Sequence, residues 1–79
     1  MILKQFFDPV SSSFTYILAK SKGKEAIIID PLQDKVEEYL SFFKENDLKL
    51  VKGIDTHTHA DHVSGLNTLR KLTKCMTIM

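Results

Sequence analysis

The fold is decided by residues 48–62, LKLVKGIDTHTHADH, in which an apolar stretch runs directly into a polar one. Residues 48–54 have the pattern of a strand. The polar run that follows contains all three histidines of the chain, together with Asp61. We therefore expect a strand that delivers a cluster of metal-ligating residue types to its carboxyl end.

The cluster has the spacing H-x-H-x-D-H and consists of His57, His59, Asp61 and His62. In an extended segment His57 and His59 point to the same side and can converge on one ion, whereas on a helix they would diverge. A turn into a following helix can bring Asp61 and His62 back to a neighbouring position, so two adjacent metal subsites are possible. Imidazole and carboxylate together suit zinc, iron or manganese, and we predict a metal site. The simpler alternative is a solvated surface loop in which Asp61 only caps the helix.

The stretch before residue 48 predicts a strand-helix-strand unit. Residues 26–29, Ala-Ile-Ile-Ile, lack polar alternation, as expected of a strand that is covered on both faces. Asp34 and Glu37 fit a capping box at the start of a helix. That helix carries an apolar stripe at i, i+3, i+4 and i+7, formed by Val36, Tyr39, Leu40 and Phe43. Such a unit normally joins parallel strands, so the histidine run should emerge at the carboxyl end of the sheet.

The flanking elements follow from similar patterns. Residues 2–7 and 14–18 read as strands, and a turn at residues 21–24 makes 14–18 and 26–29 a hairpin. Beyond His62, a second helix is predicted from the apolar positions Val63, Leu66, Leu69 and Leu72. Gly65 would allow this helix a close approach to its neighbours, and a further strand can begin at Cys75.

Three residues near the cluster have open roles. Asp30, after the Ile run, either caps a turn or supports the site loop. Asp55 and Thr56 can orient an imidazole through its second nitrogen. A closed structural zinc site is disfavoured because such sites rely on cysteine, and the single Cys75 lies well downstream. We interpret Cys75 as a small buried residue rather than a reactive thiol.

Composition restricts the class of protein. The chain has 79 residues, 43% hydrophobic and 27% charged, with a net charge of +1 and no basic run. These values are ordinary for a globular protein and support neither a nucleic acid nor a membrane as partner. One cysteine cannot form an internal disulfide, and the N-terminus lacks the charged region and long apolar core of a signal peptide, so we expect a cytoplasmic location.

Three segments together resemble the opening of a persulfide dioxygenase of the metallo-β-lactamase superfamily. They are FDPVSSSFTYIL (residues 7–18), AIIIDP (26–31) and DTHTHADHVSG (55–65). Glyoxalase II, the hydroxyacylglutathione hydrolases, shares the H-x-H-x-D-H core, but Ala60 and the run Ser13-Phe14-Thr15-Tyr16 look more like the dioxygenase branch. The resemblance implies an α/β fold, the N-terminal half of an αββα sandwich in the order β-β-β-α-β-α. Residues 1–79 would then form one incomplete domain with no second domain.

The resemblance also implies a chemistry. In the dioxygenase branch a single Fe(II) oxidises glutathione persulfide with dioxygen to sulfite; His57 would bind this iron with a later His and a later Asp, while His59, Asp61 and His62 line the site. In the hydrolase branch His57 and His59 would hold one Zn(II) and Asp61 and His62 another, for thioester hydrolysis. No catalytic residue beyond this metal cluster can be assigned.

The later ligands that both branches need are absent after His62, because residues 63–79 contain no His or Asp. We therefore expect an enzyme segment that is inactive alone and takes a glutathione-derived substrate once completed by a missing C-terminal half. Two alternatives are a small non-catalytic metal-binding module and a truncated product. A half-sandwich would expose apolar sheet surface and an unpaired edge, so self-association is expected of the isolated chain.

Overall fold

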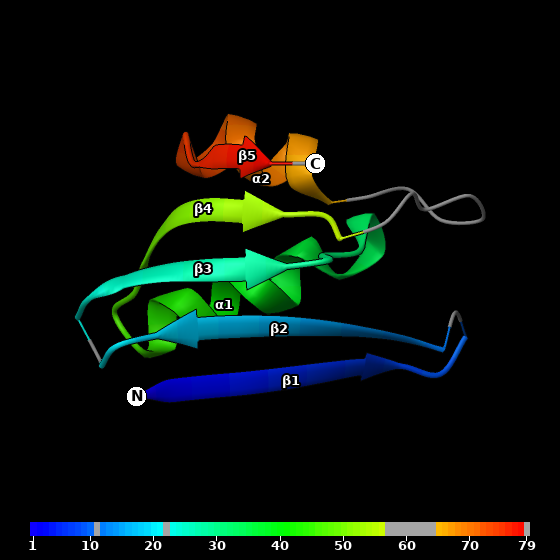
Figure 1. Ribbon diagram of the computed structural model, residues 1–79, viewed down its shortest axis with the longest axis horizontal. Coiled ribbons are helices and arrows are strands. Elements are labelled where there is room, and N and C mark those ends of the chain that lie inside the picture. The colour runs from blue at the N-terminus through cyan, green and yellow to red at the C-terminus, as the bar shows by residue number, and fades with distance from the viewer. Residues whose placement is uncertain (11, 22, 57–64, 79) are drawn as a thin grey trace.

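The computed structural model describes residues 1–10, 12–21, 23–56 and 65–78 (Figure 1). It contains one five-stranded sheet with the strand order β1-β2-β3-β4-β5. The strands are β1 (Ile2–Asp8), β2 (Ser13–Ala19), β3 (Glu25–Ile29), β4 (Lys49–Ile54) and β5 (Met76–Ile78). The helices are a 3₁₀ turn η1 (Gln33–Lys35), α1 (Val36–Glu45) and α2 (Leu66–Thr73). The predicted α/β class and the order β-β-β-α-β-α are confirmed, and β5 follows as a fifth strand.

The type of strand pairing changes once along the sheet, because β2 alone runs opposite to the other four strands. The pairs β1–β2 and β2–β3 are antiparallel, whereas β3–β4 and β4–β5 are parallel. Helix α1 connects β3 with β4, and α2 lies between β4 and β5 in the chain (Figure 1). The carboxyl ends of β3, β4 and β5 therefore lie at the same edge of the sheet, as the strand-helix-strand prediction required.

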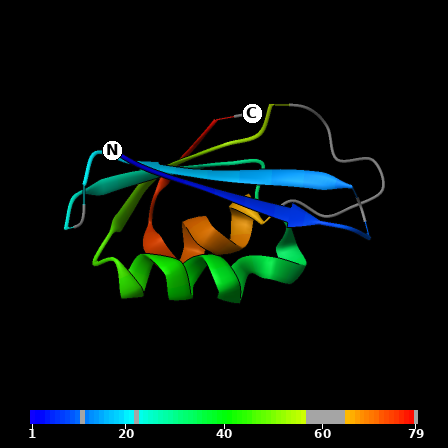
Figure 2. The same cartoon turned by 90° about the horizontal axis from the view of Figure 1, so that it is seen from below.

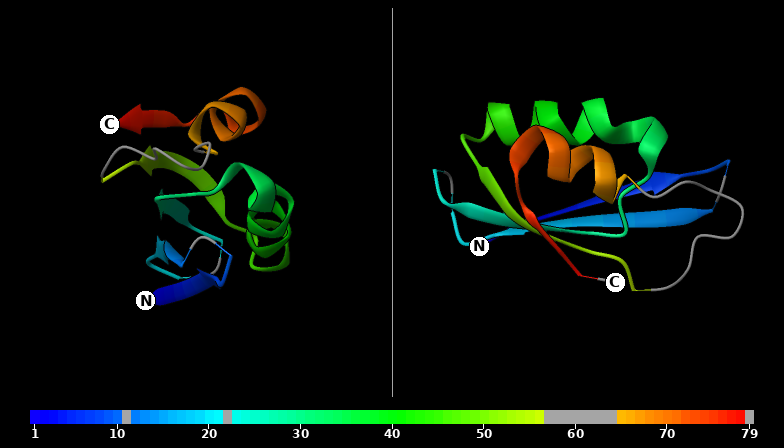
Figure 3. Two further views of the ribbon diagram at one scale, coloured as in Figure 1. Left: turned by 90° about the vertical axis from the view of Figure 1, so that its right-hand side faces the viewer. Right: turned by 90° about the horizontal axis from the view of Figure 1, so that it is seen from above.

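Both helices cover the same face of the sheet, as Figures 2 and 3 show. The core lies between them and that face, and strand side chains enter it at alternate positions. The buried core residues are Ile17, Ala19, Ala26, Ile28, Val36, Tyr39, Phe43, Leu48, Leu50, Leu69 and Cys75. The predicted apolar stripe of α1 accordingly packs on the sheet.

The opposite face of the sheet is apolar and largely open. Leu3, Phe7 and Phe14, on β1 and β2, are 62%, 54% and 44% exposed. On β3, Ala26 and Ile28 are fully buried, whereas Ile27 and Ile29 are only half-buried. The prediction of a strand covered on both faces is therefore wrong for the described residues, because both helices lie on one side.

Two local helix predictions are also wrong. Asp34 does not cap α1: it lies inside η1, and the residue before α1 is Lys35, with no side-chain cap. Leu72 does not join the apolar side of α2, since it is 61% exposed. Helix α2 begins only at Leu66, and with 3.6 residues per turn the face that contains Leu66 and Leu69 continues at Thr73.

The single cysteine gives a direct test of this packing. Cys75 is 4% exposed and belongs to the core, as predicted. We expect its thiol to react with a thiol reagent at least about 100-fold more slowly in the folded chain than in urea, because reaction requires local opening. The matched control is Met76→Cys in a Cys75→Ala background, since Met76 is 64% exposed. Equal rates for the two folded chains would contradict the burial of Cys75.

Candidate metal centre

The predicted ligands His57, His59, Asp61 and His62 lie outside the described residues, which stop at Thr56 and resume at Gly65. Their role as ligands stays a prediction. The structure does describe the residues on either side of the segment that carries them, which we call the ligand segment (residues 57–64); we refer to these flanking residues, Thr56 and Gly65, as its two ends. Asp55 and Thr56 follow β4, and Gly65 comes directly before α2.

Asp30 binds the first end of the ligand segment. It follows β3 in the left-handed conformation with φ 55°, and it is 9% exposed. Its own N–H donates to the carbonyl of Ile54 at 2.7 Å. The Thr56 N–H donates to Oδ1 of Asp30 at 2.7 Å, and the Thr56 hydroxyl donates to Oδ2 at 2.6 Å. Of the two roles open for Asp30, these two short bonds to Thr56, directly before the ligand segment, favour support of the site loop.

Residues 30–32 connect β3 with η1, and we call them the connection. Gly65, at the other end of the ligand segment, binds Pro31, the residue after Asp30 in this connection. Its N–H donates to the carbonyl of Pro31 at 2.9 Å. A Cβ at this position would lie 3.0 Å from the Leu32 carbonyl oxygen and 3.1 Å from Cγ2 of Val36. The predicted close approach is thus confirmed, because a side chain here would require Gly65 or its neighbours Leu32 and Val36 to shift. Both ends of the ligand segment rest on consecutive residues, Asp30 and Pro31.

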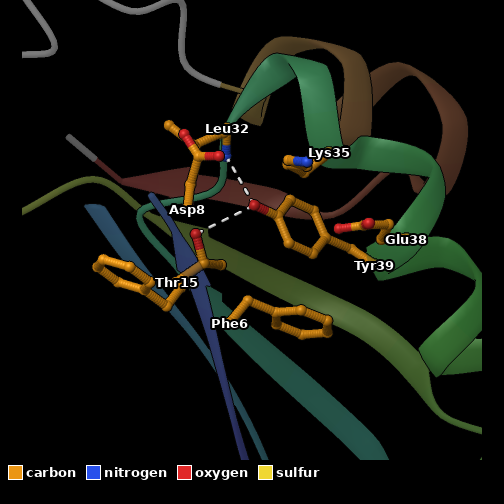
Figure 4. A pocket seen from close by; sticks show the side chains of 8 residues that line it. Phe6, Asp8, Thr15, Leu32, Lys35, Glu38 and Tyr39 are labelled. Carbon is orange, nitrogen blue, oxygen red and sulfur yellow. Dashed lines mark hydrogen bonds between the residues drawn. The ribbon is translucent and has the colours of Figure 1, made fainter. Parts of the chain in front are cut away.

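Two hydroxyls that the sequence analysis did not connect with the site also touch this connection. The Thr15 hydroxyl donates to the Asp30 carbonyl at 2.7 Å and lies 3.1 Å from the hydroxyl of Tyr39. The Leu32 N–H donates to the Tyr39 hydroxyl at 3.1 Å (Figure 4). The sequence does contain one signal for these bonds, the tyrosine in an otherwise apolar helix stripe. A buried tyrosine hydroxyl usually has a hydrogen-bond partner.

A cavity of about 100 Å³ lies beside this pair (Figure 4). It is lined by Phe6, Phe7, Asp8, Thr15, Leu32, Lys35, Glu38 and Tyr39. Pockets that enclose drug-sized ligands measure roughly 300–1,000 Å³, so this cavity is too small for a glutathione derivative. We do not assign it to the substrate.

Residues 1–10, 12–21, 23–56 and 65–78 contain no candidate metal site among themselves. Among their side chains, no three residues of the types His, Cys, Asp or Glu come together in a group that could hold a metal ion. None of the helices in these ranges has the length and apolar character needed to span a bilayer.

Comparisons with known proteins agree with the predicted resemblance. The family described as the metallo-beta-lactamase superfamily matches residues 8–79. Persulfide dioxygenase ETHE1 of Homo sapiens is 40% identical over 72 residues, covering 91% of this chain and 28% of the human protein. Hydroxyacylglutathione hydrolase of Haemophilus ducreyi is 35% identical over 63 residues, covering 80% of this chain and 26% of that protein.

A solved structure matches the fold. The crystal structure of ETHE1 from Myxococcus xanthus superimposes with a TM-score of 0.90 and 37% identity, covering 98% of this chain and 34% of that one. The chain therefore spans about a third or less of the length of these relatives. Because the family match covers nearly all of the sequence and the structural match nearly all of the fold, the chain belongs to the metallo-β-lactamase superfamily.

Proposed function

We propose that the chain is the N-terminal part of a persulfide dioxygenase-like enzyme that oxidises glutathione persulfide to sulfite. The observation that supports this proposal is the anchoring of both ends of the ligand segment, at Thr56 and Gly65, to the Asp30-Pro31 connection. This anchoring holds the residues on either side of the ligand segment at the carboxyl edge of the parallel strands, where α/β proteins bind ligands. Similarity to human persulfide dioxygenase supplies the substrate class.

The donor types of the ligand segment fit a non-haem iron, because histidine and carboxylate ligands suit Fe(II). In this proposal His57 binds the iron, and His59, Asp61 and His62 line the site. Bound iron would supply the redox chemistry with dioxygen. One dioxygen and one water are consumed per persulfide: the sulfur–sulfur bond breaks, the outer sulfur becomes sulfite and glutathione is released. The later His and Asp that the resemblance requires would come from outside these 79 residues.

The open sheet face is where we propose that the complementing part of the enzyme packs. Leu3, Phe7 and Phe14 form an exposed apolar group there, and Leu3 and Phe7 pair in register with Leu18 and Phe14 on the neighbouring strand. Burial of apolar surface contributes roughly 25 cal/mol per Å², so covering this face stabilises any chain that supplies a matching sheet. The partner is therefore expected to present an apolar β-sheet.

Two chimaeras test the function. In the first, these 79 residues replace the matching segment of human persulfide dioxygenase; in the second, they replace that of Haemophilus ducreyi hydroxyacylglutathione hydrolase. Each is loaded anaerobically with Fe(II) or separately with Zn(II). Oxygen uptake and sulfite are then measured with glutathione persulfide, and thioester hydrolysis with lactoylglutathione. We expect sulfite from the first chimaera with Fe(II), lost on His57→Ala and retained on Asn67→Ala, which changes an exposed residue of α2.

The hydrolase is the second candidate, favoured by the 35% identity to the Haemophilus ducreyi enzyme. Hydrolysis without oxygen uptake, by the Zn(II)-loaded second chimaera alone, would replace the dioxygenase proposal with this one. Folded and metal-loaded chimaeras that are both inactive would overturn both. A non-catalytic metal-binding module would then be supported if the 79-residue chain alone bound one metal tightly.

A further inference from the structure

We propose that Thr15 and Tyr39 are positioning residues, whose hydroxyls fix the connection on which both ends of the ligand segment rest. The hydrogen bonds described above link the two hydroxyls, through residues 30–32, to Thr56 and Gly65. Its last step, from these ends to a bound metal, rests on the proposed function. Neither residue would touch the metal or the substrate.

The direction of each hydrogen bond follows from counting protons. The Asp30 carbonyl can only accept, so the single hydroxyl proton of Thr15 is used on it at 2.7 Å. The 3.1 Å contact between the two hydroxyls must then use the proton of Tyr39. The Leu32 N–H can only donate, and it donates to the Tyr39 oxygen at 3.1 Å. The bonds run from Leu32 to Tyr39 to Thr15 to Asp30, and the backbone between Asp30 and Leu32 closes the ring.

The two side chains of this ring are almost completely buried. Tyr39 is 1% exposed and Thr15 is 2% exposed. Phe6 packs edge-on against the Tyr39 ring, with centroids 5.2 Å apart and an interplanar angle of 76°. Removal of either hydroxyl leaves a buried polar group of the connection without its protein partner, which costs free energy.

The ring joins three elements to the site. Thr15 belongs to β2, Tyr39 to α1, and the backbone they bind follows β3 (Figure 4). Asp30 has a φ of 55°, which is uncommon for a residue with a side chain, and its carboxylate receives both bonds from Thr56. Holding the Asp30 carbonyl and the Leu32 N–H therefore also sets the direction in which that carboxylate points.

Amide hydrogen exchange of the metal-free 79-residue chain tests the positioning step. In Tyr39→Phe we expect the amides of Thr56 and Gly65 to exchange about tenfold faster than in the parent. The amide of Leu48, which donates to the Phe43 carbonyl at the other end of β4, should change by less than about twofold. Equal acceleration at all three amides would mean general destabilisation and would overturn the proposal.

Matched variants separate the hydroxyl from the bulk of each side chain. Tyr16→Phe removes a hydroxyl from the opposite face of the sheet and should leave Thr56 and Gly65 unchanged. Thr15→Ser keeps the hydroxyl and should exchange like the parent, whereas Thr15→Val should behave like Tyr39→Phe. If Tyr39→Phe does not fold, this threonine pair decides the question by itself, and identical exchange in the two would overturn the proposal.

Zinc titration of the same chains tests the last step. We expect Tyr39→Phe to bind Zn(II) about tenfold more weakly than Tyr16→Phe. A loss of this size is typical when a residue that orients a metal ligand through hydrogen bonds is removed. Equal affinities would contradict the positioning of the ligands. If the parent itself bound no Zn(II), the proposed metal site would be contradicted. The exchange rates of the Thr56 and Gly65 amides would still test whether the two hydroxyls hold the connection in place.

Discussion

Asp30→Ala is expected to lower the free energy of unfolding by about 3 kcal/mol. The substitution removes the carboxylate that accepts two bonds from Thr56, at 2.7 and 2.6 Å. It also places alanine at a φ of 55°, where aspartate is tolerated better. Urea unfolding followed by circular dichroism measures the effect, and a midpoint equal to that of the parent would show that these bonds contribute nothing.

Two variants separate the contributions to this effect. Asp47→Ala changes another aspartate in the left-handed conformation, with φ 54°, but at an exposed position in the turn after α1. It should cost only about 1 kcal/mol, the backbone part alone. Asp30→Asn keeps one acceptor oxygen and should fall between the two. If Asp47→Ala were as costly as Asp30→Ala, backbone conformation would account for the loss.

Gly53→Val is expected to lower the free energy of unfolding by about 3 kcal/mol and to displace the start of α2. A Cβ on Gly53 would lie 2.4 Å from Cδ2 of Leu66 and 3.6 Å from Cγ2 of Ile28. Leu66 is 3% exposed, so it has little room to turn away. The backbone of Gly53 is not in the left-handed region, so the cost comes from packing. Urea unfolding gives the free energy, and the Gly65 amide resonance reports the displacement.

The control is a double variant in which the side chain that clashes with residue 53 is shortened. Gly53→Ala combined with Leu66→Ala removes the clashing methyl group, and we expect the pair to cost less than the sum of the two single changes. Additive costs, or a parental midpoint for Gly53→Val, would mean that α2 is not held against β4 in this way.

The order of elements could be predicted from the sequence because its signals are local. The Ile run, the apolar stripe from Val36 to Phe43 and the strand before the histidines have different periods, and the strand-helix-strand rule then makes the strands parallel. The location of the ligand segment, after β4, followed from the same rule. The close approach at Gly65 was predictable because only glycine lacks the Cβ that would collide.

The errors arise where the outcome depends on partners distant in sequence. Asp34 and Glu37 fit a cap locally, but the chain enters α1 through η1, and Leu32, directly before η1, is buried and bonded to Tyr39. Leu72 follows Leu66 and Leu69 at a spacing of three, which moves each successive residue by roughly 60° around an α-helix, so Leu72 leaves the buried face. The bonds from Thr15 to Asp30 and from Thr56 to Asp30 span 15 and 26 residues, and no periodicity in the sequence encodes them.

The attachment of Thr56 and Gly65 to two consecutive residues divides the molecule into a frame and an exchangeable insert. Asp30 and Pro31 hold the chain on either side of residues 57–64 through backbone groups and one carboxylate, none of which belongs to the insert. A substitution within residues 57–64 therefore removes none of the groups that form these hydrogen bonds. In this architecture, the hydrogen bonds that hold the two attachment points and the predicted metal ligands belong to different residues.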